Sequence, residues 1–380
     1  MAKVFVPRES EAGETRVAAT PETVRGFVKA GFDVVVEHDA GASAGFTNAE
    51  FEEAGAKIGY ELGEADLVLC IRPLEPEACG KLKPGAIVIG SLQPTVHTNS
   101  VQALANAKAT SFGLELVPRI TRAQKMDILS SQATAAGYQA VLMAAAHLPK
   151  FFPLLMTAAG TIKPARVFIL GAGVAGLQAI ATARRLGAVV EANDVRSAAA
   201  EQVESLGAKF VDTGTPPQAE TTGGYAKETT HEYLMKQREI LTKHVSDADV
   251  VITTALIPGR KAPVIVTADM VKAMHPGSVI VDLAVAAGGN VEGSVAGKIV
   301  DVGGVKIIGE PNLPSLVGTD ASRMWARNVL DFVKPMFKEG GGLEPDWEDE
   351  VLLASVVTRD GQIVHEGAKQ AQQSSKDASQ

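Results

Sequence analysis

Short apolar runs alternate along the chain with segments of helical periodicity, a pattern typical of buried parallel strands joined by helices. In the first third we expect strands at Lys3–Val6, Phe32–Glu37, Leu67–Ile71, Ile87–Gly90 and Ser111–Leu114. The pattern resumes later, with expected strands at Val167–Leu170, Val189–Asn193, Lys209–Val211, Val250–Thr253, Val279–Asp282 and Val305–Ile308. Two series of this kind predict an α/β fold with two doubly wound sheets.

The segment from Arg166 to Arg196 has the element order of a dinucleotide-binding unit: strand, glycine turn, helix, strand and acid. Gly171 permits a tight turn, Gly173 lets the backbone approach a pyrophosphate, and Gly176 lets helix and strand pack closely. We expect nucleotide contacts in this unit from Gly171, Gly173, Val174, Ala175, Gly176, Asp194, Val195 and Arg196. A glycine turn without a ligand is the alternative.

Asp194 is the acid at the end of the second strand of this unit. Its carboxylate is placed to accept hydrogen bonds from both hydroxyls of an adenosine ribose, and it would repel a 2′-phosphate. The unit therefore favours NAD(H) over NADP(H). Arg196 is the counter-argument, because an arginine there is able to bind that phosphate.

The whole pattern predicts two Rossmann-like, doubly wound domains with a cleft between them, joined by long helices. The first comprises residues 1–125 and 320–370 and lacks the dinucleotide fingerprint, since a helix expected at Ala321–Phe337 returns to it. The second comprises residues 126–319 and binds NAD. We expect residues 371–380 to form a disordered tail, because they are rich in Ala, Gln, Ser and Lys.

Residues 121–145 predict one long linking helix with Thr121 as its N-cap. Polar residues recur in it at three- and four-residue spacing, at Gln124, Asp127, Ser131 and Thr134. Such a stripe is either a solvated face or, because it lies between two α/β domains, the lining of a cleft. Gly137 in the same helix would permit a close approach or a bend.

Two other regions of the second domain are candidates for ligand contact. The loop 212–228 has a length typical of lids and binding loops and contains Tyr225, although an ordinary exposed loop is the alternative. The ends of two expected strands fall at the carboxyl edge of the sheet, where ligands bind. The candidates there are Thr253, Thr254, Ala255, Leu256, Asp282 and Leu283.

Composition narrows the classes of function. A net charge of −8 without a basic cluster argues against nucleic acid as a partner. The chain has two cysteines, Cys70 and Cys79, and begins without a secretory signal, which favours the cytoplasm. The most apolar stretch, residues 140–156, is interrupted by His147, Lys150 and two prolines, so we expect no membrane crossing. We expect no metal site.

Four stretches resemble domain I, the NAD(H)-binding portion of the α subunit of proton-translocating nicotinamide nucleotide transhydrogenase. The resemblance covers nearly the whole chain and is most specific at residues 118–132, 171–176, 222–228 and 253–259. In that family an arginine, a glutamine, an aspartate and a serine surround the nicotinamide and its ribose. By resemblance these are Arg119, Gln124, Asp127 and Ser130. The family's mobile-loop tyrosine matches Tyr225, and its ribose-binding acid matches Asp194.

Residues 14–18 are similar to alanine dehydrogenases, which share the fold. That subfamily uses a lysine and a histidine of its first domain, and their places are taken here by Arg72 and Gln93. A glutamine amide is not a proton acceptor, so the missing pair argues against alanine oxidation. One departure from the transhydrogenase pattern is Ala286-Ala287, where an acid is expected.

The resemblance implies a peripheral NAD(H)-binding subunit that passes a hydride from NADH to NADP⁺ held on an NADP(H)-binding β subunit. It implies proton translocation in membrane-spanning partner subunits, a homodimer, and a cytoplasmic location at the membrane surface. Two alternatives stay open. One is an alanine dehydrogenase-like NAD oxidoreductase, and the other is a catalytically silent NAD-sensing module.

Overall fold

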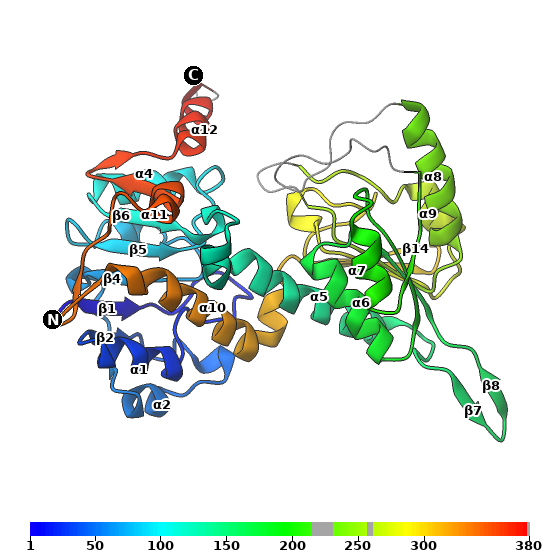
Figure 1. Cartoon of the computed structure of the whole chain (residues 1–380), viewed down its shortest axis with the longest axis horizontal. Helices are drawn as coiled ribbons and strands as arrows, with labels where there is room; N and C mark the ends of the chain where they lie inside the picture. The colour runs from blue at the N-terminus through cyan, green and yellow to red at the C-terminus, as the bar shows by residue number, and fades with distance from the viewer. Residues whose placement is uncertain (215–230, 257–260, 378–380) are drawn as a thin grey trace. The chain divides into compact units, whose positions relative to one another are not determined.

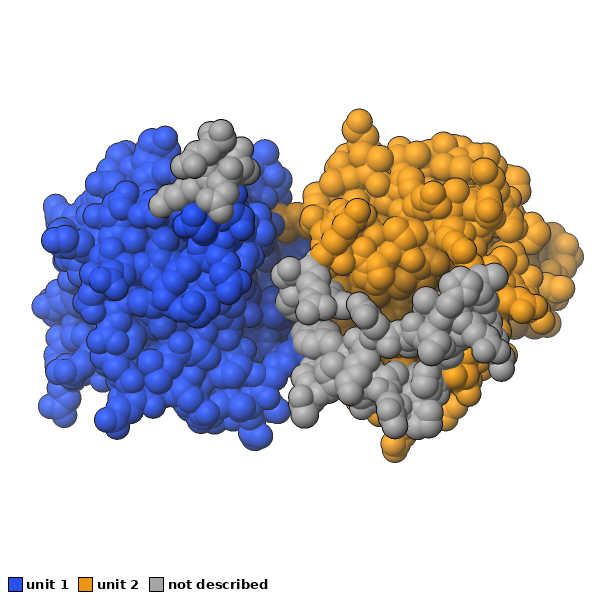
Figure 2. Space-filling view, turned by 90° about the horizontal axis from the view of Figure 1, so that it is seen from above, with its two compact units in different colours: residues 1–132, 314–380 blue, residues 133–313 orange. Residues whose placement is uncertain are grey.

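The computed structural model describes residues 1–214, 231–256 and 261–377. The chain forms two compact units, which Figure 2 shows in different colours. Unit 1 comprises Met1–Gln132 and Pro314–Gln380, and unit 2 comprises Ala133–Leu313. The division therefore falls at 132/133 and 313/314, where we expected 125/126 and 319/320.

In the described residues, unit 1 is built on an eight-stranded sheet with the order β19-β18-β6-β5-β4-β1-β2-β3. Its strands are β1 (Lys3–Val6), β2 (Asp33–Val36), β3 (Lys57–Ile58), β4 (Leu67–Leu69), β5 (Ile87–Gly90), β6 (Thr110–Gly113), β18 (Val356–Arg359) and β19 (Gln362–Ile363). β1 to β6 pair in parallel, and β18 pairs antiparallel to β6. Its principal helices are α1 (Pro21–Lys29), α2 (Asn48–Glu53), α3 (Pro76–Cys79), α4 (Thr98–Asn106), α10 (Gly318–Val333), α11 (Glu350–Ser355) and α12 (Glu366–Asp377).

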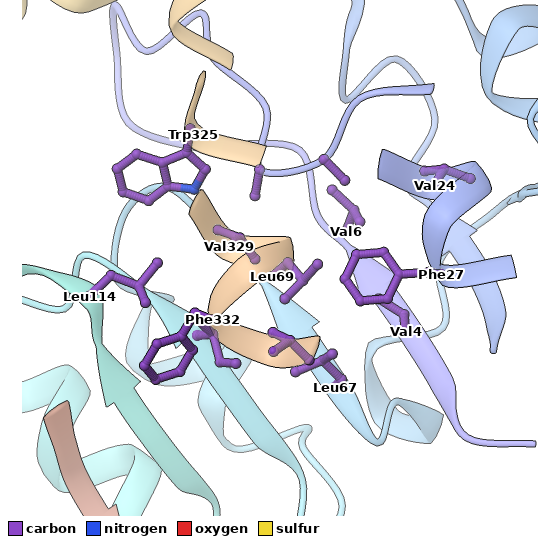
Figure 3. Close-up of a cluster of buried hydrophobic side chains, with 14 of the residues drawn as sticks. Val4, Val6, Val24, Phe27, Leu67, Leu69, Leu114, Trp325, Val329 and Phe332 are labelled. Carbon is purple, nitrogen blue, oxygen red and sulfur yellow. The ribbon is translucent and has the colours of Figure 1, made fainter. Parts of the chain in front are cut away.

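Helices cover both faces of this sheet, which explains why its strands are continuously apolar. Val4 and Val6 of β1 pack on one face with residues of α1 and α10. Phe5, between them, packs on the other face with residues of α4. Figure 3 shows Trp325 and Phe332 of α10 lying over the first of these faces. The C-terminal segment of the chain thus completes the core of unit 1.

The described portion of unit 2 is built on a seven-stranded sheet with the order β11-β10-β9-β12-β13-β15-β14. Its strands are β9 (Arg166–Leu170), β10 (Val189–Asn193), β11 (Lys209–Phe210), β12 (Val250–Thr253), β13 (Val279–Asp282), β14 (Lys298–Val302) and β15 (Val305–Gly309). All pair in parallel except β14, an antiparallel edge strand. Helices α5 (Ile128–His147), α6 (Val174–Arg185) and α7 (Ala199–Ser205) cover one face, and α8 (His231–Ser246) and α9 (Ala268–Ala273) cover the other (Figure 1).

The prediction of one helix from Thr121 was wrong. The structure has a 3₁₀ segment, η4 (Thr121–Met126), and α5 begins only at Ile128. Asp127 between them is extended and caps α5: its Oδ1 accepts the Ser130 N–H at 2.9 Å, and its Oδ2 accepts the Ser130 hydroxyl at 2.5 Å. Gln124 and Asp127 therefore do not lie on a face of α5.

The prediction of a disordered tail was wrong as far as Asp377, because α12 extends to that residue. Ala368 of α12 is buried in the core beside α4, and the Gln372 side chain donates to the Thr98 carbonyl at 2.6 Å. The expected helix Ala321–Phe337 also differs. α10 begins at Gly318 and ends at Val333, and a 3₁₀ turn, η7 (Lys334–Met336), follows.

Candidate functional site

The carboxyl ends of four neighbouring strands of unit 2 lie level with one another. The pairing register aligns Asn193 of β10 with Leu170 of β9, Leu170 with Thr253 of β12, and Thr253 with Asp282 of β13. The loops that follow these strands therefore meet at one edge of the sheet, the usual place for a ligand in a parallel α/β fold.

Close packing requires glycine at two positions, Gly171 and Gly176, at the turn between β9 and α6. Gly171 has φ +101°, and a Cβ added there would lie 2.5 Å from the Thr254 hydroxyl. A Cβ on Gly176 would lie 1.9 Å from the Gly171 carbonyl oxygen. On the opposite side, a Cβ on Gly137 would lie 2.1 Å from the Ala175 carbonyl oxygen. The close approach expected at Gly137 is therefore confirmed, and α5 packs directly on the first turn of α6.

Gly173 differs from these glycines, because a Cβ added to it would meet no heavy atom of the described residues within 4 Å. Its φ of −74° is accessible to any residue, so backbone strain does not require glycine there. Gly173 precedes the first turn of α6, and the neighbouring Val174 side chain is exposed. This open space lies at a helix N-terminus, where free N–H groups bind phosphates.

Replacing Gly173 and Gly176 by alanine is expected to separate binding from folding. Gly173→Ala should leave the free energy of unfolding within about 0.5 kcal/mol and weaken NADH binding about tenfold, by filling the space for the pyrophosphate. Gly176→Ala should destabilise the protein by roughly 1–3 kcal/mol, because its methyl group overlaps a backbone carbonyl. Calorimetric NADH titration and urea unfolding measure the two effects. Native NADH affinity in Gly173→Ala would contradict this placement of the pyrophosphate.

Asp194 follows β10 and is tied to the glycine turn. Its buried carboxylate accepts the Ala172 N–H at 2.7 Å, the Arg196 N–H at 2.8 Å and the Arg196 guanidinium at 2.9 Å. Burial alone would raise the pKa of this carboxyl group, but these hydrogen bonds and the adjacent cation outweigh burial and lower it. Arg196 is thus already paired with an anion, and Val195 between them is half-buried.

The residues expected at the ends of β12 and β13 divide into two groups. The Thr254 hydroxyl donates to the Gly171 carbonyl at 3.0 Å, and Leu256 is exposed. The second group, Thr253 and Asp282, is buried in the interior of unit 2. The Thr253 hydroxyl donates to Asp282 at 3.1 Å, and the fully buried Asp282 also accepts backbone N–H groups from the loop that follows it. These contacts make Asp282 a support for that loop, with Leu283 packed on the core beside it.

The candidates taken from the first motif lie on one continuous segment of the chain. Gln124 is exposed on η4, Arg119 is exposed just before it, and Asp127 and Ser130 contact each other at the start of α5. The structure therefore brings Asp127 and Ser130 together. Tyr225 belongs to residues 215–230, which lie outside the described residues.

Unit 1 also contains a cavity of about 130 Å³ that sequence reasoning did not predict. Its lining comprises Arg16, Ile71, Arg72, Ser91, Ile128, Leu129, Gln132 and Trp325. The Arg16 guanidinium is bound by both oxygens of Glu14, at 2.7 and 2.6 Å, and donates to Gln132 at 2.8 Å. The Glu14-x-Arg16 spacing is a sequence signal for this arrangement. None of these lining side chains is an acid or a histidine that could accept a proton near neutral pH.

Two shielded carboxylates hold the strand-end loops beside this cavity. Glu9 accepts the N–H groups of Ile71 and Arg72 at 2.6 and 3.1 Å. Glu115 accepts those of Leu92 and Gln93 at 3.2 and 2.6 Å. Burial raises the pKa of Glu9 to about 7, although its two hydrogen bonds oppose the shift, and burial raises the pKa of Glu115 in the same way.

The raised pKa of Glu9 predicts that unit 1 loses stability between pH 5 and pH 8. An acid whose pKa is higher in the folded state stabilises the fold below its ordinary pKa of 4.5, and this contribution is lost as the pH rises through 7. We expect the free energy of unfolding to fall by roughly 1–3 kcal/mol over this range in the native protein, and to fall less in Glu9→Gln. Urea unfolding followed by tryptophan fluorescence reports on unit 1, which holds both tryptophans, Trp325 and Trp347. If the free energy of unfolding changed equally with pH in the native protein and in Glu9→Gln, the raised pKa of Glu9 would be contradicted.

Comparison with known proteins relates this arrangement to one family. A family model described as the N-terminal domain of alanine dehydrogenase/PNT matches residues 5–136, and the model of the C-terminal domain matches residues 140–366. One similar protein is the first portion of the NAD(P) transhydrogenase subunit alpha of Rhodospirillum rubrum. It is 50% identical to this chain over 375 residues, an alignment that covers 96% of this chain and 98% of that protein.

Two solved structures agree with this result. The transhydrogenase of Sinorhizobium meliloti superposes with a TM-score of 0.85 at 44% identity, covering 96% of this chain and 99% of that one. An L-alanine dehydrogenase superposes with a TM-score of 0.83 at 27% identity, covering 98% and 99%. The two doubly wound units predicted from the sequence are therefore confirmed. The chain belongs to the alanine dehydrogenase/PNT family, on its transhydrogenase branch.

Proposed function

We propose that this chain is the NAD(H)-binding subunit of a proton-translocating NAD(P) transhydrogenase and passes a hydride between NADH and NADP⁺ held on a partner subunit. One observation carries the proposal. The glycine turn, the open space at Gly173 and the carboxylate of Asp194 lie at one level edge of the unit 2 sheet. The relatives on the transhydrogenase branch support the same assignment.

The residues present fit a bound NAD(H) at this edge. The α6 N-terminus beside Gly173 would hold the pyrophosphate, and Asp194 would accept hydrogen bonds from the adenosine ribose. Arg196, the residue that could bind a 2′-phosphate, already has Asp194 as its counter-ion. The part of the proposed site that would hold the adenosine ribose therefore favours NAD(H) over NADP(H).

Bound NAD(H) supplies the hydride chemistry, so this chain needs no acid, base or metal for that step. Its residues hold and orient the nicotinamide and keep water away from it. We assign the orienting role to Arg119, Gln124, Asp127 and Ser130, and the exclusion of water to the loop that contains Tyr225. The exposed position of Gln124 on a short 3₁₀ segment suits contact with a partner's nucleotide.

The partners follow from the reaction and from the names of the relatives. The Rhodospirillum rubrum relative is named as a portion of an alpha subunit, which implies further chains. In the described residues, the helices are too short or too polar to cross a bilayer. We assign proton translocation to membrane-spanning partner subunits, NADP(H) binding to a β subunit, and a cytoplasmic, peripheral position to this chain. No nucleic acid takes part.

The decisive experiment mixes the purified chain with an NADP(H)-binding partner subunit and follows deuterium from C4-labelled NADH. Direct transfer to NADP⁺ without loss of label to water supports the proposal. NADH binding without transfer would instead favour the NAD-sensing module. Oxidation of alanine by the unmixed chain would favour the alanine dehydrogenase-like alternative, although the cavity of unit 1 lacks a proton acceptor among its lining residues.

We also propose that the chain forms a homodimer through the hairpin of β7 (Leu155–Thr157) and β8 (Gly160–Ile162). This two-stranded hairpin projects from unit 2 (Figure 1), and a hairpin without a third strand is marginally stable by itself. Apolar side chains are exposed at Met156 and Ile162 of the hairpin and at Leu154 just before it, and Met156 is 80% exposed. Contact with a second copy would bury them.

Introducing a charge into this hairpin is expected to dissociate the dimer. Met156→Asp should shift the sedimenting species from dimer to monomer at micromolar concentration, because an aspartate would be desolvated at the interface. Val96→Asp changes a residue of similar exposure on unit 1 and should leave the dimer intact. Dimeric Met156→Asp, or a native chain that sediments as a monomer, would contradict the proposal.

A further inference from the structure

Asn290, in the loop after β13, binds the backbone at Ala255 and Pro263, which precede it by 35 and 27 positions. It is fully buried, and its side-chain oxygen accepts the Ala255 N–H at 3.0 Å. Its side-chain nitrogen donates to the carbonyls of Ala255 and Pro263, both at 2.8 Å. Both donors of the amide and its acceptor are therefore used to fix two pieces of backbone.

The backbone that Asn290 holds lies beside the glycine turn. Ala255 follows Thr254, whose N–H donates to the Leu170 carbonyl at 2.8 Å and whose hydroxyl donates to the Gly171 carbonyl at 3.0 Å. Asn290 is thus connected to the first glycine of the turn through its hydrogen bonds to Ala255, the Thr254–Ala255 peptide bond and the hydrogen bond of Thr254 to Gly171.

The backbone of Asn290 is itself held by a hydrogen bond to the Asp282 carboxylate. The Asp282 carboxylate accepts the backbone N–H of Asn290 at 3.0 Å and also those of Ala284 and Val291, at 3.0 and 3.3 Å. The loop that carries Asn290 is therefore fixed by a buried anion, so its amide is rigidly placed. Burying a carboxylate is costly unless donors surround it, and here several do.

We infer that Asn290 is a positioning residue for dinucleotide binding, which acts by fixing the Ala255 peptide at the sheet edge in the orientation that the bound nucleotide requires. The inference rests on the proposed NAD(H) site of unit 2. Asparagine suits the position because one acceptor and two donors are needed on a short side chain. An aspartate would supply no donor when ionised, and an alanine would leave three backbone groups unpaired.

The test compares NADH dissociation constants of folded variants by calorimetry. Asn290→Ala should raise the dissociation constant about tenfold or more, because the Ala255 peptide is released. Thr358→Val is the matched control: it removes a buried hydroxyl in unit 1 that donates to the Ala109 carbonyl at 2.9 Å. It should lose comparable stability and keep native NADH affinity. If Asn290→Ala does not fold, Asn290→Ser, which retains one donor, takes its place.

The Asn290→Asp variant gives a readout that a purely structural role would not move. Near pH 8 the introduced carboxylate would face the carbonyl oxygens of Ala255 and Pro263, and NADH affinity should be low. Toward pH 6 it should take up a proton, donate to one carbonyl and recover affinity several-fold, whereas Asn290→Ala should not recover. Among the described residues, other charged groups near this loop are Lys261, packed against Gly288, and Glu292, which accepts the Ala268 N–H; both are present in every variant.

Native NADH affinity in Asn290→Ala would overturn the inference. So would an affinity loss in Asn290→Asp that does not change with pH, since that result indicates a general loss of structure. Native protein that does not bind NADH would refute the proposed function itself, and the native titration is therefore done first.

Discussion

Replacing Gln124 by asparagine is expected to slow hydride transfer to NADP⁺ about a hundredfold in the reconstituted complex. Shortening the side chain by one methylene withdraws its amide by about 1.5 Å, and a misplacement of roughly 1 Å costs about that factor in a reaction that depends on geometry. NADH binding should change only a few-fold, because the pyrophosphate and adenosine contacts that we propose are all in unit 2. Single-turnover transfer and calorimetric titration measure the two quantities.

Gln102→Asn is the matched control for this experiment. It makes the same change on α4 of unit 1, where the Gln102 amide donates to Asn106 at 3.0 Å. Its transfer rate should be native. If Gln124→Asn also transfers hydride at the native rate, Gln124 is only a solvated residue of η4 and the assignment is refuted.

Replacing Asp194 by asparagine should weaken NADH binding by roughly 1.5–3 kcal/mol, about 10- to 150-fold. The change removes a charged acceptor for the ribose and also disturbs the hydrogen bond to Ala172 that ties the glycine turn to β10. It releases Arg196 from its counter-ion as well. NADPH affinity should therefore fall less than NADH affinity, and the preference for NADH should narrow.

Asp301→Asn is the control, since Asp301 lies on β14 of the same sheet and accepts the Gly304 N–H at 2.9 Å. It should bind NADH like the native chain. Equal affinity of the native protein for NADPH and NADH would refute the NAD(H) preference and identify Arg196 as a phosphate ligand.

Local signals predicted much of the fold. The bounds of β1, β5, β12 and β13 coincide with those expected from apolar runs, because each run is buried on both faces and ends where the chain leaves the sheet. The glycine turn was also predictable, because its three glycines stand at characteristic spacing between an apolar strand and a helical segment.

The features that sequence reasoning missed depend mostly on contacts between distant residues. The break before α5 is the exception, because Asp127 caps the helix through Ser130, a local signal that the Ala-rich pattern obscured. α12 forms because Ala368 and Gln372 pack against α4, far away in sequence. Asn290 is separated from Ala255 by 35 positions, so its bonds to that peptide could not be read from either segment alone.

The boundary between the units falls inside helix α5, and this restricts how such a gene can recombine. A crossover at 132/133 would separate Ile128–Gln132 from the rest of α5, and a stub of five residues is too short to hold a helix. A crossover between the two family segments, near residue 138, would transplant α10 and β18 together with unit 2 and so replace a portion of the core of unit 1. Recombination between relatives is therefore expected to exchange the two units together.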